Sequence, residues 1–188
     1  YVYGELGHDA PDVDDADALK NFFAAIQTMN RDGILLAYHD RSDGGLWATL
    51  AEMAFSGRTG IDVDIAELGP DPVRTLFSEE LGAVVQIASA DRNRFEYAMN
   101  EAGLSHHIHR LGRPSSDGQV RVSMGGETIL NEGLLSLFAD WTQTSHHIQS
   151  LRDNPSCADQ EREWLLSADN TGLSANLAFD PEEKRVFQ

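Results

Sequence analysis

The sequence has few basic residues, one cysteine and no long hydrophobic run, and each scarcity excludes a class of protein. Only 14 Lys and Arg residues stand against 31 Asp and Glu residues, so the formal net charge is −17. A chain this acidic repels nucleic acid and anionic lipid, so we expect neither as a partner. The single cysteine, Cys157, excludes an internal disulfide framework and a cysteine-based structural zinc site. No stretch approaches the roughly 20 consecutive apolar residues of a membrane-spanning helix.

The remaining composition suits a compact domain. The chain has 188 residues, of which 41% are hydrophobic, and this is too apolar for a disordered protein. A chain of this length can bury a core without a disulfide or a metal. It starts with Tyr1 rather than methionine and shows no signal-like segment, which predicts a fragment of a longer cytoplasmic protein.

Charge and periodicity predict three parts: a leader helix within residues 1–33, an α/β domain over residues 34–151, and an extended linker over residues 152–188. The leader has one apolar helical face because its large side chains recur at i, i+3, i+4 and i+7. The acidic residues between 12 and 17 lie where this helix begins, and we expect them to cap it. The members of the apolar face are Leu19, Phe22, Phe23 and Ile26.

The order of elements in the central part predicts an α+β fold. Its split βαβ-like mixed sheet would have helices packed on one face, and a helical or extended tail would follow. The expected helices span residues 46–55, 91–102 and 134–151. The expected strands span residues 34–40, 61–65, 81–88, 107–111, 120–124 and 128–130.

The densest chemical signal is residues 39–46 (HDRSDGGL), where a predicted strand ends and a helix begins. Open α/β sheets place ligands at the carboxyl ends of strands, and glycines let the backbone approach a phosphate closely. Asp40 offers a hard oxygen ligand for Mg²⁺, Ser42 a hydroxyl donor and Arg41 a cation. The alternative is a purely structural turn in which Ser42 or Asp43 caps the helix.

Other polar clusters have structural interpretations as well. Glu79 and Glu80 precede a buried strand and suit either the edge of a site or a solvated strand end. The histidines near residues 106–109 and 146–147 point apart on a strand or a helix, which favours surface positions over a metal site. Cys157 has no histidine near it in the sequence, which favours a free thiol over a nucleophile.

Five segments together resemble one enzyme family. They are residues 36–46 (LAYHDRSDGGL), 50–55 (LAEMAF), 76–82 (LFSEELG), 152–155 (RDNP) and 157–161 (CADQE). In this order they resemble phosphoribosylformylglycinamidine synthase, also called formylglycinamide ribonucleotide amidotransferase, in its large single-chain bacterial form. The resemblance implies the C-terminal domain of the second AIR-synthetase-like unit, followed by the linker toward the glutaminase domain.

The resemblance also implies a function and a site. The family makes formylglycinamidine ribonucleotide from formylglycinamide ribonucleotide, ATP and glutamine-derived ammonia in purine biosynthesis. In the family's pattern Asp40 matches a Mg²⁺ ligand and Ser42 a nucleotide contact, while His39, Gly44 and Gly45 line the same pocket. The implied cofactors are Mg²⁺ and ATP or ADP, and the implied partners are the phosphorylated ribonucleotide substrate and the remaining domains of the parent synthetase. We assign no catalytic residue here. The sequence lacks the family's long glycine-rich nucleotide loop and its glutaminase Cys–His–Glu arrangement, and Asp40 alone is too few ligands for Mg²⁺, so we expect the fragment to be inactive alone.

Two other functions stay open at this point. One is a selenophosphate-synthetase-like ATP-dependent enzyme, which predicts a catalytic Cys or selenocysteine loop upstream. The other is a structural and interaction module, in which the glycine turn only starts a helix. The family has a catalytic nucleotide site and a site with a retained nucleotide, and the loop at Asp40 and Ser42 suits either, with the retained site favoured.

Overall fold

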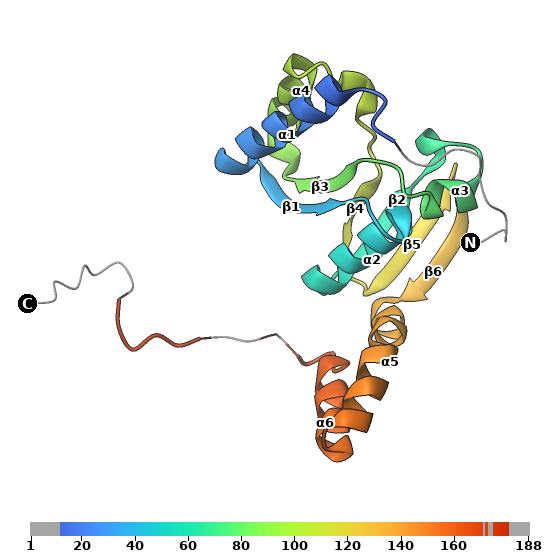
Figure 1. Ribbon diagram of the computed structural model, residues 1–188, viewed down its shortest axis with the longest axis vertical. Coiled ribbons are helices and arrows are strands. Elements are labelled where there is room, and N and C mark those ends of the chain that lie inside the picture. The colour runs from blue at the N-terminus through green and yellow to red at the C-terminus, as the bar shows by residue number, and fades with distance from the viewer. Residues whose placement is uncertain (1–11, 171, 173–174, 181–188) are drawn as a thin grey trace, which may run out of the picture. The chain divides into compact units, whose positions relative to one another are not determined.

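The computed structural model describes residues 12–170, 172 and 175–180 (Figure 1). The chain divides into two compact units, Tyr1–Leu137 and Phe138–Gln188. The boundaries predicted after residues 33 and 151, between leader, domain and linker, stay predictions. In the described part of the chain, no helix is long and apolar enough to span a membrane.

The first unit contains α-helices, β-strands and short 3₁₀ turns in mixed order. The helices are α1 (Ala16–Arg31), α2 (Gly45–Gly57), α3 (Pro72–Phe77), α4 (Arg92–Glu101) and the start of α5 (Leu134–Arg152). The strands are β1 (Leu35–Asp40), β2 (Gly60–Asp64), β3 (Ala83–Ile87), β4 (Gly112–Ser115), β5 (Gln119–Met124) and β6 (Glu127–Gly133). The 3₁₀ turns are η1 (Ala66–Leu68), η2 (Ser89–Asp91) and η3 (Ser105–His107).

The strands form two sheets. β1 and β3 pair in antiparallel fashion, and the other four strands follow the order β4-β2-β5-β6. In the second sheet β2 runs parallel to β5, while the β2–β4 and β5–β6 pairs are antiparallel. The prediction of an α+β fold with a mixed sheet and packed helices is therefore confirmed.

One core lies between the four-stranded sheet and helices α2 and α3. On α2, Leu46, Leu50 and Ala54 are buried and recur at i, i+4 and i+8, which is one face of a helix. They pack in the same cluster as alternate residues of the neighbouring strands, such as Val63 and Val122. The start of α2 is thereby held on a rigid support, and this start is where the predicted site lies.

A second core lies where α1 and α4 cover the β1–β3 sheet (Figure 1). The predicted apolar face of α1 is wrong at two positions, because Phe23 is 65% exposed and Leu19 is 44% exposed. The prediction is right for Ile26, which is buried, and for Phe22, which is partly buried, and the helix also buries Met29 in the core that it shares with α4. The predicted capping is confirmed in a specific form, since the Asp15 carboxylate accepts hydrogen bonds from the Asp17 and Ala18 N–H groups.

One predicted strand and the start of the predicted extended linker differ from the structure, and one helix was missed. The strand expected over residues 107–111 is absent, and the chain instead forms η3 and then β4, which begins at Gly112. Helix α3 was not predicted, although Asp71 caps it and Pro72 begins it. Helix α6 (Pro155–Leu165) occupies the start of the tail, where an extended linker was expected. Residues 171, 173–174 and 181–188 of the predicted linker lie outside the described residues.

The second unit joins the rest of α5 to α6. Asn154 caps α6 through its side chain, and Pro155 follows at the first helical turn, where a missing N–H costs nothing. The two helices are joined by a His146–Asp159 contact of 2.9 Å and by a hydrogen bond from Arg162 to the Ala139 carbonyl.

The turn between β4 and β5 yields a prediction about acid stability. Hydrogen bonds from the Ser115 hydroxyl, the Arg121 guanidinium and the Gln119 N–H lower the pKa of Asp117 from 3.8 to about 2. A carboxyl whose pKa is lowered by folding stabilises the fold above its unfolded pKa, and this contribution disappears as the pH falls through the folded pKa. Asp117→Asn should therefore lower the stability at pH 6, and the difference from wild type should shrink between about pH 4 and pH 2. Urea unfolding over this range measures it, and a constant difference would contradict the assignment.

Candidate functional site

The loop between β1 and α2 is open to solvent, as a ligand site requires. The Asp40 side chain is 65% exposed, and Ser42, Asp43 and Gly44 are also exposed. Gly45 is buried beneath them at the first position of α2. The loop is therefore not covered by its own side chains, and the carboxylate proposed as a metal ligand faces outward.

Glycine is required at the end of this loop by backbone conformation. Gly44 has φ +80° and Gly45 has φ +66°, in the left-handed region that side chains disfavour. Gly44 is the residue that caps α2, and it makes no side-chain capping hydrogen bond. The capping residue is therefore Gly44 rather than Ser42 or Asp43, so the structural alternative named the wrong cap, and a purely structural turn stays an alternative. The turn closes through a hydrogen bond of 2.9 Å from the Gly45 N–H to the Ser42 carbonyl.

Thr49 ties the loop to the helix that follows it. Its side chain is almost fully buried, and its hydroxyl lies 3.2 Å from the Asp40 carbonyl and 3.0 Å from the Gly45 carbonyl. A buried hydroxyl with an acceptor on each side of a turn favours that shape of the turn, since both carbonyls lie within reach of its single proton.

The segment before β3 lies against this loop, so two clusters that were separate in the sequence form one site. The antiparallel pairing of β1 and β3 places Asp40 opposite Ala83. The Arg41 guanidinium donates two hydrogen bonds to the Ser78 carbonyl, at 2.8 and 3.1 Å. The Arg41 N–H donates another to the Gly82 carbonyl at 2.9 Å.

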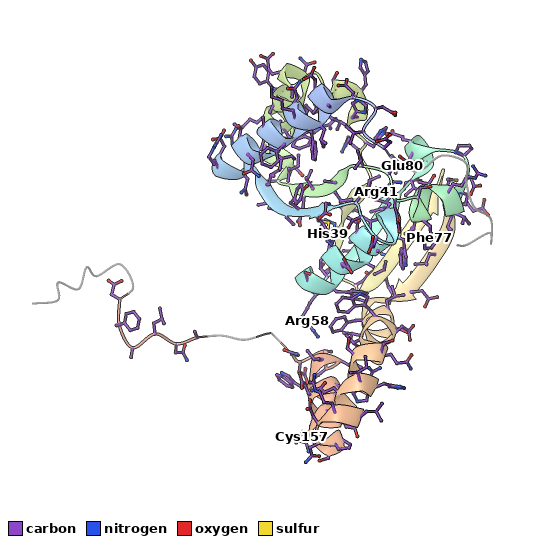
Figure 2. The ribbon with its side chains drawn as sticks, in the orientation of Figure 1. His39, Arg41, Arg58, Phe77, Glu80 and Cys157 are labelled. Carbon is purple, nitrogen blue, oxygen red and sulfur yellow. The ribbon has the colours of Figure 1, made fainter. Side chains whose placement is uncertain are left out.

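Arg41 is occupied by these contacts and is not the free cation that the sequence suggested. Burial lowers the pKa of its guanidinium, and the nearby Glu80 carboxylate partly opposes that effect (Figure 2). Its role in the structure is to fasten one loop to the other.

The Glu79 carboxylate contacts the turn at the position where a phosphate was predicted to bind. One of its carboxylate oxygens accepts a hydrogen bond of 3.1 Å from the Gly44 N–H. Main-chain N–H groups at a helix start are the donors that phosphate oxygens use elsewhere. Here a carboxylate of the same chain already holds one of them.

His39 links the end of β1 to α2. Its Nδ1 lies 2.6 Å from the Asp40 carbonyl, and its Nε2 lies 2.8 Å from a Glu52 carboxylate oxygen. Burial alone would lower the pKa of His39, but the hydrogen bonds to the Asp40 carbonyl and to Glu52 outweigh it and raise that pKa. The imidazole is thus held by two acceptors and lies beside the turn rather than inside it.

The donors at the loop suit Mg²⁺ only as part of a larger ligand set. Within the described residues, no group of three or more His, Cys, Asp and Glu side chains converges on a metal position. Mg²⁺ bound with a nucleotide takes one or two carboxylates, phosphate oxygens and water, so a single outward carboxylate is compatible with that role. Asp40 would hold the ion, which would neutralise phosphate charge when bound.

The sequence located the loop residues but missed their partners. Asp40, Ser42, Gly44 and Gly45 lie in one turn, with His39 at its edge. Glu52 and Ser78 were not predicted to contact the loop, and nothing local in the sequence signals either contact. Glu79 was noted as a possible site edge, and only the strand pairing brings it to Gly44.

The fold is a mixed α+β domain with an open, acidic glycine turn between a strand and a helix. The chain belongs to the family described as AIR synthase related protein, C-terminal domain, which matches residues 3–125.

Solved structures of Thermotoga maritima PurL share the fold. PurL complexed with ATP has a TM-score of 0.57 and 20% identity, over 65% of this chain and 22% of that one. PurL complexed with FGAR has a TM-score of 0.54 and 19% identity, over 63% and 20% of the two chains. Phosphoribosylformylglycinamidine synthase II from the same organism has a TM-score of 0.56 and 20% identity, over 64% and 21%. At these identities the similarity shows the fold, and the match spans only about a fifth of each of those proteins.

Proposed function

We propose that this chain is part of an ATP-dependent synthetase that makes formylglycinamidine ribonucleotide from formylglycinamide ribonucleotide and ammonia in purine biosynthesis. Membership of the AIR synthase related family supports the assignment. Structures with the same fold carry ATP in one case and FGAR in another. The single observation that carries the proposal in this chain is the solvent-open glycine turn, with Asp40 exposed at the end of β1.

The turn is proposed to bind the phosphates of ATP or ADP together with Mg²⁺. Asp40 would ligate the metal, and Ser42 and Gly44 would contact the nucleotide at the surface of the turn. Gly45 would contribute by allowing the tight turn, because it is buried beneath it. His39 would position the carbonyl of Asp40 through its hydrogen bond to that group. Of the family's two nucleotide sites, we propose that this turn belongs to the one that retains its nucleotide.

The rest of the reaction is proposed to depend on other parts of a parent chain. The large single-chain form would add a glutaminase domain that supplies ammonia, with the segment after residue 151 leading toward it. A cytoplasmic location fits that role and stays a prediction. We expect the 188-residue chain alone to show no synthetase turnover with ATP, formylglycinamide ribonucleotide and ammonia. A measurable rate would contradict the assignment of the remaining ligands to other domains.

Asp40→Asn tests the metal assignment, and Asp43→Asn is its control because both replace an exposed carboxylate of the same loop. We expect Asp40→Asn to weaken Mg·ADP binding about tenfold, since a neutral amide oxygen replaces a charged ligand. Asp43→Asn should change the affinity much less, because only general charge is lost. NMR titration of the 188-residue chain detects millimolar binding at the loop amides. Equal affinities in wild type and Asp40→Asn would contradict the proposal, as would the absence of any response at residues 40–46.

A further inference from the structure

The mouth of the loop carries mainly negative charge. Asp40 and Asp43 on one segment and Glu79 and Glu80 on the other are all exposed. The cation among them, Arg41, is turned to the Ser78 carbonyl. A metal-free phosphate approaching this mouth meets like charges at short range, whereas a phosphate neutralised by a divalent cation does not.

Glu79 differs from the other three carboxylates because it also holds a main-chain donor of the turn. Its oxygen lies 3.1 Å from the Gly44 nitrogen, at the residue that caps α2. A phosphate oxygen that used the Gly44 N–H would have to displace this carboxylate. Glu79 therefore competes with an anion by occupying its donor as well as by its charge.

The structure holds Glu79 in this position through the residue before it. The Ser78 carbonyl accepts two hydrogen bonds from the Arg41 guanidinium. A Cβ atom on Gly45 would lie only 2.8 Å from that same carbonyl oxygen, so the two segments are in close contact there. The contact between Glu79 and Gly44 is thus supported by rigid neighbours on both sides, although both residues are exposed.

We propose that Glu79 is a specificity residue. Its carboxylate makes the loop bind a Mg²⁺-complexed phosphate in preference to a metal-free phosphate. This inference rests on the proposed nucleotide function of the same loop. When a metal-free phosphate approaches, the carboxylate keeps the Gly44 N–H and repels the anion. When the phosphate carries Mg²⁺, its charge is reduced, and the released carboxylate faces a cation that favours oxygen ligands.

The experiment compares Glu79→Gln with Glu80→Gln in the 188-residue chain. Both variants lose one negative charge from adjacent exposed positions, but only residue 79 contacts the Gly44 N–H. Glutamine offers a neutral amide oxygen in place of the carboxylate, so the turn should stay folded while the weaker acceptor gives up the Gly44 N–H to a phosphate more easily. The probes are inorganic phosphate, ADP without metal and ADP with Mg²⁺, each followed by NMR shifts of the Gly44 and Gly45 amides.

We expect Glu79→Gln to bind inorganic phosphate and metal-free ADP about fivefold more tightly than wild type, the size of an exposed charge interaction. The preference for Mg·ADP over metal-free ADP should fall by the same factor, while Glu80→Gln keeps most of it. Equal preferences in wild type and Glu79→Gln, with binding intact, would overturn this inference and leave the proposed function standing. Equal changes in the two variants would also overturn it, because general charge alone would then explain them. If no protein responds to any probe at these amides, the proposed function fails and the inference fails with it.

Discussion

Gly45→Ala should destabilise the first unit by about 3 kcal/mol. Its φ of +66° costs a residue with a side chain about 1–2 kcal/mol. A Cβ there would also lie 2.8 Å from the Leu76 and Ser78 carbonyl oxygens and 2.9 Å from the Phe77 carbonyl carbon. These are main-chain atoms at the end of α3, so they cannot move aside as a flexible side chain would, and crowding adds about 1–3 kcal/mol. Urea unfolding monitored by circular dichroism measures the loss.

Gly33→Ala is the matched control for this substitution. Gly33 has nearly the same backbone angle, with φ +67°, but beyond its own chain neighbours no described atom lies within 4 Å of the position that its Cβ would take. Its replacement should therefore cost about 1–2 kcal/mol, from the backbone angle alone. If the two variants lose the same stability, the close contact between the start of α2 and the end of α3 is refuted.

Arg41→Ala should destabilise the same unit by about 2 kcal/mol, because a hydrogen bond from a charged donor contributes about 1.5–3 kcal/mol when its partner is left unpaired. Two such bonds end on the Ser78 carbonyl, and the guanidinium is partly buried over them. The variant should also loosen the segment that carries Glu79. Faster hydrogen exchange at the Gly44 amide, compared with wild type, would report that loosening at the site itself.

Arg41→Lys separates the geometry of this side chain from its charge. Lysine keeps the positive charge near Glu80 but cannot donate two parallel hydrogen bonds from a planar group. We expect it to recover less than half of the stability that Arg41→Ala loses. Full recovery by lysine would show that the charge, rather than the two hydrogen bonds, holds the segments together.

Much of the local structure could be predicted from the sequence because its signals are short-range. The apolar spacing on α2 and the alternation of apolar residues on β2 involve residues only a few positions apart in the sequence. The two glycines after Asp43 likewise mark a turn in which backbone conformation limits the residue type. The strand, loop and helix around the candidate site follow from these patterns, and they place Asp40, Ser42 and Gly44 together.

Long-range packing explains what the sequence prediction missed. Phe22 and Phe23 are equally apolar, and only packing against the second core decides that Phe22 is partly buried while Phe23 stays exposed. The strand expected over residues 107–111 fails for a related reason, since pairing with β2 begins at Gly112. Apolar content alone does not reveal which residues find a partner strand.

Most of the elements and the residues of the turn follow from local sequence, because propensity, capping and periodicity act between residues close along the chain. Tertiary structure alone decided that Arg41 faces a carbonyl instead of a ligand and that Glu79 reaches the Gly44 amide, across 35 positions of sequence. The antiparallel pairing of β1 with β3 causes both, since it places the end of one strand beside the start of the other. The charge that a ligand meets at this loop therefore depends on strand pairing, which no local sequence pattern encodes.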